Sequence, residues 1–498
     1  MAGVDSQIGG SPWPLPDFAG PASPAYLPAY LERPGETARA VAPPIPGSQV
    51  QKEIRSMDAP LPATAKEKEA GAADANESSS GAPTDRPSPA FSPFSAIRPF
   101  ASLAQVEGAL TLRVGRVERS RGATPAPHDE FAALADVWNS LAGSVPFRSL
   151  EWLAAWWRHY QSPGWQTYLL KVEDTAGQVV GIAPWYLSRS PMAGRVIQFL
   201  GSGEVCSEYQ TILAKPGCET EVAIAISQWL GHEGARDWDM LLLSAVAADD
   251  PATAALAEDF ADCGHMVDRR PGMPCWRREL PSTWDEFVQQ LSKSRRERLR
   301  QLTRKYFDTR RARTRWVENI ADLDDAFAMF VDMHQRRRQS LGQPGCYSSR
   351  QFADFHAEVS RRLCAQGKLR LLWTELDRRP VGAEYDFIDG RTVYYYSTGV
   401  EPDATADHPG WLAMIGSLRR AIDEGCRWFD FLRGDEAYKC SWGARPFATL
   451  ETRIIARRRL AGLRYQAWLG RQQLRKWGKG IKEWNSRRKA TTPKTEQT

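Results

Sequence analysis

The order of predicted secondary-structure elements occurs twice along this 498-residue chain. In each half, helical periodicity comes first. Two strand-like segments joined by a polar turn follow, and then a further strand, a helix and a last strand. Because the two halves share few identical residues, their comparison depends on the order of the elements. That order predicts a tandem duplication of one α/β (α+β) unit, divided near Pro281.

The elements of the first half begin near residue 110. Apolar residues at helical spacing predict two helices within residues 131–160, and Ser149 has the position of an N-terminal cap for the second. Apolar segments then predict strands at 167–172, 179–186, 196–200 and 240–243, with a helix at 220–230 before the last strand.

The second half repeats this order. Helices are predicted at residues 322–338, 349–365 and 411–424, and strands at 369–375, 381–388, 393–398 and 428–431. Gly425 is suited to end the third helix, because glycine readily takes the left-handed conformation of a helix terminus.

The two ends of the chain differ from this pattern. Residues 1–105 are rich in Pro, Ala, Ser and Gly without a sustained period, which predicts a disordered arm. From Thr452 onward the chain has 14 Lys or Arg and only two acidic residues, Glu483 and Glu496, so this segment has a net charge of +12. Because the whole chain has a net charge of +5, the rest of it has a net charge of −7. We therefore expect an arm (1–105), two domains (106–280 and 281–456) and a basic amphipathic tail (457–498).

Several classes are excluded or disfavoured by composition. The chain has no apolar run of the roughly 18 residues that a membrane span needs. Its start lacks the cationic and apolar regions of a secretory signal, so we expect a cytoplasmic protein. The eight Cys form no C-x-x-C pair and have no His at ligand spacing, so no metal is expected.

A strand-to-helix junction in the second half is a candidate anion site. The strand that contains Ser397 and Thr398 leads to His408, Pro409 and Gly410, where a helix begins. The unpaired N–H groups of a helix start attract phosphate. The segment contains neither a Walker A motif nor G-x-G-x-x-G, so an ordinary turn remains the alternative.

A second cluster follows the last predicted strand. Arg433, Asp435, Tyr438 and Lys439 place a cation, a carboxylate, a phenol and an amine within a few residues of a strand end. Strand-end loops position functional groups well because the sheet behind them is rigid. In the structural alternative, Asp430 pairs with Arg433, and Tyr438 packs on a neighbouring Trp.

The motif Phe-Asp-Phe-Leu-Arg-Gly-Asp-Glu-x-Tyr-Lys-x-x-Trp-Gly, with Ser-Leu-Glu-Trp-Leu-x-x-Trp-Trp and an Arg-rich helix after Leu291, resembles the CelD-like acetyltransferases linked to cellulose biosynthesis. The resemblance covers about residues 130–455. It implies two GNAT-like domains in tandem, as in Fem-type transferases, each a mixed sheet flanked by helices.

The resemblance also implies acyl-CoA as donor, with its pantetheine between splayed strands and its diphosphate at residues 407–412. The implied donor-binding residues are Ser397, Thr398, His408, Gly410, Trp411 and Leu412. The family's Gln/Arg-x-x-Gly-x-Gly/Ala loop is not intact, because no Gly or Ala stands two residues after Gly410. Tyr438 matches the position of a tyrosine that often protonates the leaving thiolate in GNAT enzymes.

The attacking amine or hydroxyl needs a base, for which Glu384 and Asp386 are candidates. Alternation along a strand places both on one face, which is either catalytic or exposed to solvent. Arg433, Asp435 and Lys439 are the expected substrate-binding residues, since cations hold anionic groups. The expected site is a thioester-sized slot flanked by Gly410 and Tyr438.

Two basic segments lie outside these motifs. Residues 293–315 hold 11 Lys or Arg against two acidic residues, with a narrow apolar stripe of Leu299, Leu302 and Tyr306. This segment is either a solvated face or a binding surface for nucleic acid, acidic saccharide or CoA phosphates. In the tail, Leu474, Trp477, Ile481 and Trp484 recur at helical spacing among cations, which fits an interfacial helix or one that docks on its own domain.

Three functions follow as hypotheses. The first is an acyltransferase, with acetyl-CoA as the expected donor and an envelope or exopolysaccharide component as acceptor. The second is Fem-type aminoacyl transfer from an RNA-linked donor. The third is a non-catalytic scaffold that binds a polyanion or the inner face of the membrane through its basic segments.

Overall fold

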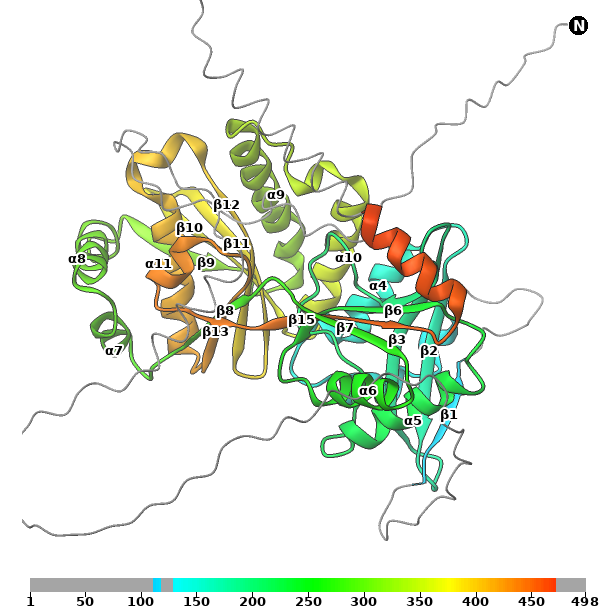
Figure 1. Cartoon of the computed structure of the whole chain (residues 1–498). Helices are drawn as coiled ribbons and strands as arrows, with labels where there is room; N and C mark the ends of the chain where they lie inside the picture. Colours follow the sequence, from blue (N-terminus) through cyan, green and yellow to red (C-terminus); the bar gives the residue numbers. More distant parts are fainter. Residues whose placement is uncertain (1–110, 118–128, 472–498) are drawn as a thin grey trace, which may run out of the picture. The chain divides into compact units, whose positions relative to one another are not determined.

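The computed structural model describes residues 111–117 and 129–471 (Figure 1). The predicted N-terminal arm and the tail beyond residue 471 lie outside the described residues. The described chain is a mixed α/β structure with two sheets, each flanked by helices on both faces. No helix among the described residues is long and apolar enough to cross a membrane.

The first sheet consists largely of strands from the first half of the chain. Its order is β1 (Arg113–Arg116), β2 (Gln166–Glu173), β3 (Val179–Ser190), β4 (Gly194–Phe199), β6 (Met240–Ala247), β15 (Thr449–Ile455) and β7 (Met266–Pro271), with β5 (Leu213–Ala214) beside β3. Helices α2 (Asp129–Ala132), α3 (Ala135–Ala142) and α4 (Leu150–Tyr160) contribute to the core on one face, and α5 (Glu219–Gly231) and α6 (Pro251–Asp262) on the other.

The second sheet has the order β14 (Arg445–Phe447), β8 (Cys275–Glu279), β13 (Trp428–Arg433), β12 (Thr392–Val400), β11 (Arg379–Asp389), β10 (Leu369–Leu376) and β9 (Ala312–Trp316). Helices α9 (Leu323–Ser340) and α10 (Arg350–Ala365) share a core with one face. The other face packs against α7 (Trp284–Gln289), α8 (Lys293–Leu302), α11 (Pro409–Asp423) and α12 (Ala437–Ser441).

The predicted duplication of an α/β unit is confirmed by the topology. In each sheet four strands pair antiparallel in chain order, and a helix then leads to a strand that runs parallel to the fourth. The predicted hairpins and helices agree with the observed elements to within a few residues. Ser149 caps α4 as expected, because its side chain accepts a hydrogen bond from the N–H of Trp152.

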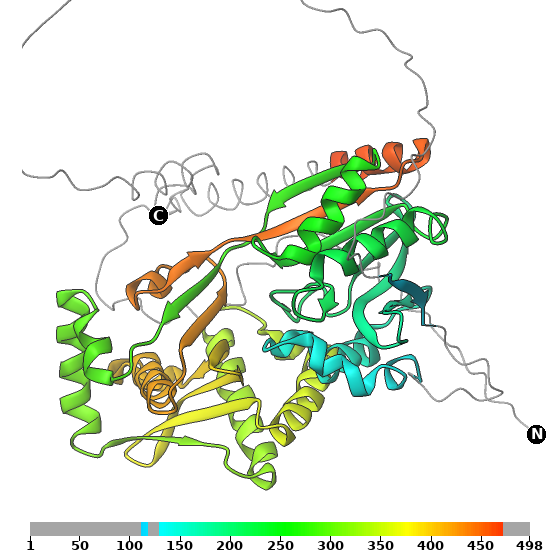
Figure 2. The same cartoon turned by 90° about the horizontal axis from the view of Figure 1, so that it is seen from below.

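The two sheets exchange strands. After β7, which lies in the first sheet, the chain continues into β8, which pairs with β13 in the second. After β14 in the second sheet it returns as β15, which pairs with β6 and β7 in the first. In Figure 2 the connection from β7 to β8 is green and the connection from β14 to β15 is orange, and the two cross between the sheets. The sheets therefore do not divide at residues 280 and 281, where the sequence places the domain border.

One hydrophobic core joins the two halves. It includes side chains of α4 in the first half and of α10 and β11 in the second. Trp152 is fully buried, with its ring centroid 5.1 Å from that of Phe355 and 5.4 Å from that of Phe387. Edge-to-face aromatic pairs of this kind add to the free energy gained from burial alone. The halves therefore form a single packed body.

The tail begins with a helix over residues 459–471 that docks on the first domain. Tyr465 and Trp468 are buried against the sheet. The Tyr465 hydroxyl donates a hydrogen bond to Asp268 of β7, and the guanidinium of Arg453 in β15 lies 4.7 Å from the Trp468 ring centroid. This first part of the tail therefore packs on its own domain. The predicted interfacial positions from Leu474 to Trp484 lie outside the described residues.

Candidate active site

The two parallel strands of the second sheet separate part-way along their length. β12 and β13 are paired over three residues each, and the last pair is Tyr394 with Asp430. Beyond it, Leu432 has a φ of 56°, and the pairing of β13 with β8 shifts register before Arg433. Irregularities of this kind bend a strand away from its neighbour. We call the region beyond the last pair the fork.

Aromatic side chains fill the start of the fork on the face that α11 covers. Tyr395 and Phe431 are the first residues beyond the last pair, and their ring centroids are 5.7 Å apart. Tyr438 of α12 packs edge-on against Phe431 at 6.2 Å and is 9% exposed. The tyrosine predicted as the acid therefore lies at the fork.

The start of α11 lies close to the end of α12. Trp442, directly after α12, has its ring centroid 5.1 Å from that of Trp411 in the first turn of α11. Gly410 and Tyr438 consequently belong to two elements that are in contact. The predicted slot between these two residues stays a prediction.

The two candidate bases lie on one face of β11, as strand alternation predicts, and both are fully buried. The Asp386 carboxylate accepts hydrogen bonds from the Tyr396 backbone N–H (3.1 Å) and the Ser417 hydroxyl (3.5 Å). Neither oxygen of Glu384 accepts a hydrogen bond of ordinary geometry from the described residues. A solvent-exposed face, the alternative that the sequence left open, is excluded.

Burial shifts the pKa of both carboxyl groups upward. It raises the pKa of Glu384 to about 8, against the opposing effects of the Ser417 hydroxyl and the Arg370 guanidinium. The pKa of Asp386 lies well above its usual range, because burial and the adjacent charge of Glu384 both disfavour ionisation. The Arg370 guanidinium itself binds Glu424 and the Ser417 carbonyl. The pair therefore retains protons at neutral pH.

Tyr395 lies within electrostatic range of all three predicted catalytic residues. Burial raises the pKa of its phenol well above the usual value, and the charged forms of Glu384, Tyr438 and Asp386 raise it further. The Thr398 hydroxyl donates a hydrogen bond to the phenol oxygen of Tyr395. Sequence reasoning missed Tyr395, although three consecutive tyrosines at a strand end were a usable signal.

The predicted donor-binding residues fall into two places. Ser397 and Thr398 are buried in β12, whereas the others surround the start of α11, after the short 3₁₀ segment Pro402–Asp407. His408 has a left-handed conformation (φ 54°), and its carbonyl accepts hydrogen bonds from the N–H groups of Trp411 and Leu412. The N–H of Gly410 has no backbone partner among the described residues.

The three predicted substrate-binding residues differ in environment. Arg433 is ion-paired with Glu208 of the first domain. Lys439 is fully buried, and its ammonium group donates to the carbonyls of Leu432 (3.2 Å) and Arg433 (2.6 Å) and pairs with Glu436 (3.0 Å). Its charge thus stabilises the end of β13. Asp435 is exposed.

A loop from the first domain reaches the fork, which the sequence did not predict. We call residues 201–212 the inter-domain loop. Tyr209 donates a hydrogen bond to Asp430 at 2.7 Å, and Glu208 pairs with Arg433. The hydroxyl of Tyr396 donates to the carbonyl of Val205 at 2.7 Å. The loop therefore contacts both strands of the fork.

The inter-domain loop is strained and tightly held. Cys206 and Tyr209 have φ values of 50° and 60°, which L-residues rarely adopt. The Arg148 guanidinium binds the Tyr209 carbonyl, and Trp152 donates to the Ser207 hydroxyl at 2.8 Å. Backbone strain persists where surrounding contacts determine the conformation, and it concentrates at functional sites.

Charges at this junction are paired across the two halves. Asp430 is fully buried, and its carboxylate accepts hydrogen bonds from the Arg277 guanidinium at 2.8 Å and from the Tyr209 hydroxyl. Burial raises its pKa, and Arg277 opposes the shift. Burial likewise raises the pKa of Glu208, against the effect of Arg433. The alternative pairing of Asp430 with Arg433 is not what the structure shows.

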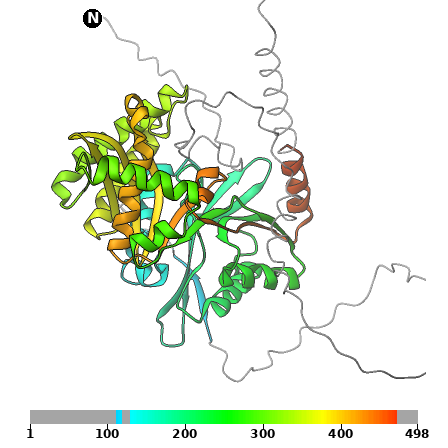
Figure 3. The same cartoon turned by 90° about the vertical axis from the view of Figure 1, so that its left-hand side faces the viewer.

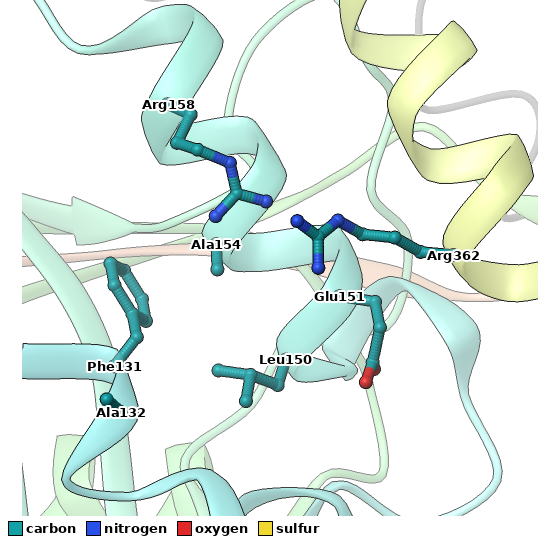
Figure 4. Close-up of a pocket in the computed structure, with 7 residues that line it drawn as sticks. All are labelled: Phe131, Ala132, Leu150, Glu151, Ala154, Arg158 and Arg362. Carbon is teal, nitrogen blue, oxygen red and sulfur yellow. The ribbon is translucent and has the colours of Figure 1, made fainter. Parts of the chain in front are cut away.

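A separate pocket of about 230 Å³ lies between α4 and α10 and is lined by Phe131, Ala132, Leu150, Glu151, Ala154, Arg158 and Arg362. Figure 4 shows the guanidinium groups of Arg158 and Arg362 turned toward one another. Both groups are ion-paired with the single carboxylate of Glu358. None of the predicted site residues lines this pocket.

The region that contains the fork has a recognisable family pattern. Residues 293–440 match the acetyltransferase (GNAT) domain. The match begins at α8 and ends within α12, so it includes the fork, β11 and α11. No curated protein matches the sequence. The resemblance to the CelD-like family stays a prediction.

Several solved structures are similar at low identity. The structure of FemX is 12% identical, with a TM-score of 0.46, over 64% of this chain and 95% of FemX. A tandem GNAT protein from the clavulanic acid biosynthesis pathway is 12% identical, with a TM-score of 0.35, over 69% of this chain and 98% of that one. The C-terminal domain of a putative lysylphosphatidylglycerol synthetase from Agrobacterium fabrum is 8% identical, with a TM-score of 0.41, over 65% of this chain and 92% of that one.

Proposed function

We propose that this protein is an acyltransferase that moves an acyl group, in the first instance acetyl, from acyl-CoA to an amine or hydroxyl. One observation carries the proposal: within the region that matches the GNAT domain, β12 and β13 separate after Tyr394 and Asp430, and Tyr438 packs at that point. A GNAT domain implies an acyl-CoA donor. The thioester of that donor would enter the fork.

The residues at the start of α11 are compatible with the donor's diphosphate. The N–H of Gly410 is available, and basic side chains of α8 are adjacent. Leu412 stands where the family has a small residue, but its side chain is fully buried in the core below α11. A side chain directed into the core does not cover the N–H of Gly410, so this departure leaves room for phosphate.

We assign Tyr438 the role of acid. As the acceptor nitrogen or oxygen attacks the carbonyl carbon, a bond to that carbon forms and the carbon–sulfur bond breaks. Tyr438 then donates its proton to the departing thiolate. Its position against Phe431 at the fork supports this role.

Glu384, in the fraction of molecules in which it is ionised, would accept the acceptor's proton. A base works best when its pKa is near the working pH, and the pKa of about 8 for Glu384 meets that condition. Asp386, which holds its proton more firmly, would act as the partner that keeps one proton within the pair.

The acceptor class rests on the motif resemblance alone. We propose a component of the cell envelope or an exopolysaccharide, bound near Asp435, the exposed member of the predicted substrate-binding set. A panel of amino sugars, saccharides and amines is therefore the appropriate first set of acceptors.

The test compares turnover of the purified full chain with that of Tyr438→Phe. We expect CoA release to fall at least tenfold, since general acid catalysis typically contributes a factor of about 10²–10⁴. Tyr186→Phe, which removes another buried phenol hydroxyl in the first domain, is the matched control. CoA should be measured by chromatography, because Cys263 and Cys440 are exposed and would react with a thiol reagent. Equal rates for Tyr438→Phe and the native protein would remove Tyr438 from the mechanism.

A further inference from the structure

The cationic helix α8 and the single π-helical turn after it (Thr303–Phe307) carry positive charge that the described protein does not neutralise. Between residues 293 and 305 Glu297 is the only acidic residue. No ion pair within the described residues involves the following cations: Lys293, Arg296, Arg298, Arg300, Arg304 and Lys305. Like charges three or four residues apart destabilise a helix, so a bound anion would stabilise this one.

This segment lies directly beside the first turn of α11. The Arg298 guanidinium contacts the ring nitrogen Nε2 of His408. The hydroxyl of Tyr306 donates to Asp407 at 2.8 Å. Arg295 lies with its guanidinium carbon 4.3 Å from the ring centroid of Trp411. In Figures 1 and 3, α8 lies along the outer side of the second domain.

The two flanks of α8 differ in what they face. Leu299 and Leu302 are buried and define the side toward the domain. At about 100° per residue, Arg298 lies on one flank of that side and Arg300 on the opposite flank. Lys305, in the next turn, acts on the same group as Arg298: burial and the charges of both lower the pKa of His408.

An unpartnered donor lies near the same place. The indole N–H of Trp442 is fully buried and has no hydrogen-bond partner among the described residues. The Trp442 ring centroid is 5.4 Å from the Arg295 guanidinium carbon. Purines stack on planar aromatic and guanidinium groups, and Trp411 and Arg295 place one of each beside α8.

We propose that α8 and the turn after it bind the nucleotide end of the donor, with Arg298 and Lys305 as ligands of the 3′-phosphate of CoA. This inference rests on the proposed function, which places the diphosphate at Gly410. The 3′-phosphate is the remaining anion of CoA, and Arg298 and Lys305 are the cations next to that turn. An RNA backbone, in contrast, would extend over both flanks and would also contact Arg300.

The test is calorimetric titration of the full chain with CoA and with dephospho-CoA, which differ only in the 3′-phosphate. We expect CoA to bind about tenfold more tightly, the effect of one or two charge-assisted contacts. In Arg298→Gln combined with Lys305→Gln, the ratio of the two affinities should fall to about one, with the affinity for dephospho-CoA unchanged. Arg300→Gln, with the same loss of charge on the opposite flank, should keep the native ratio.

Four results would overturn the inference. Equal affinities of the native protein for CoA and dephospho-CoA would overturn this inference and leave the proposed function intact. If neither compound binds, both the inference and the proposed function fail. An equal loss of affinity in Arg300→Gln and Arg298→Gln would indicate a diffuse field instead of a phosphate site. If deacylated tRNA displaces CoA from the native protein but not from Arg300→Gln, the surface binds RNA. Lys305→Gln alone, at an exposed position, provides a variant whose folding is not at risk.

Discussion

Glu384→Gln should stabilise the protein at neutral pH, although it removes the proposed base. The folded-state pKa of Glu384 is about 8, whereas its ordinary value is 4.5. A raised folded-state pKa means that stability is fully present below pH 4.5 and is lost progressively until the pH exceeds about 8. At pH 7 the unfolded chain has lost this proton and the folded chain has kept it, which favours unfolding.

The size of the effect follows from the interval between the ordinary pKa and pH 7. At about 1.4 kcal/mol per pH unit, the ionisable carboxyl lowers the free energy of unfolding at pH 7 by about 3 kcal/mol relative to pH 4. Glutamine has nearly the same shape and does not ionise. The difference in free energy of unfolding between Glu384→Gln and the native protein should therefore increase by about 3 kcal/mol from pH 4 to pH 7.

Urea unfolding at several pH values measures this difference. Glu358→Gln is the control with the opposite sign, because hydrogen bonds from Arg158 and His159 outweigh burial and lower the pKa of Glu358 to about 2. Glu358→Gln should lose stability at pH 7. A difference for Glu384→Gln that stays constant between pH 4 and pH 7 would show that Glu384 ionises normally in the folded protein, and the argument for its burial would fail.

Three further predictions concern the fork, the packing behind it and the docked tail helix. Turnover should rise with pH up to about pH 8, as Glu384 loses its proton, and a rate–pH profile that is flat from pH 6 to pH 9 would contradict this. Gly399→Ala should lower the free energy of unfolding by about 2 kcal/mol in urea titrations, because a Cβ there would lie 2.8 Å from the backbone nitrogen of His334. Trp468→Ala should cost about 3 kcal/mol and speed hydrogen exchange in residues 459–471, whereas Leu463→Ala, at a 67% exposed position, should change neither. Unchanged exchange in Trp468→Ala would show that this helix docks without its tryptophan.

Local sequence patterns were sufficient to predict the repeated unit. Strand alternation and helical spacing are properties of neighbouring residues, so the hairpins and the final strand of each half were readable. The strand exchange was not readable. β7 (MVDRRP) and β8 (CWRRE) are short and rich in arginine, and nothing in such segments indicates which of two similar sheets they join.

The same distinction applies to the site. Alternation placed Glu384 and Asp386 on one face, but acidic residues are usually exposed, so their complete burial beneath α11 was not predictable. Lys439 was predicted to contact substrate because cations hold anionic groups. The structure instead turns it back onto the carbonyls of Leu432 and Arg433. The contacts of Glu208 and Tyr209 depend on how two domains pack and left no signal in the sequence.

Calorimetric titration of the purified full chain with acetyl-CoA tests the central claim most directly, since every proposed step begins with this donor at the fork. The account predicts saturable binding at one site per chain, weakened by a bulky substitution at Gly410 and unaffected by Arg362→Gln at the pocket between α4 and α10. An absence of binding, or binding that Arg362→Gln abolishes and a substitution at Gly410 leaves unchanged, would contradict it.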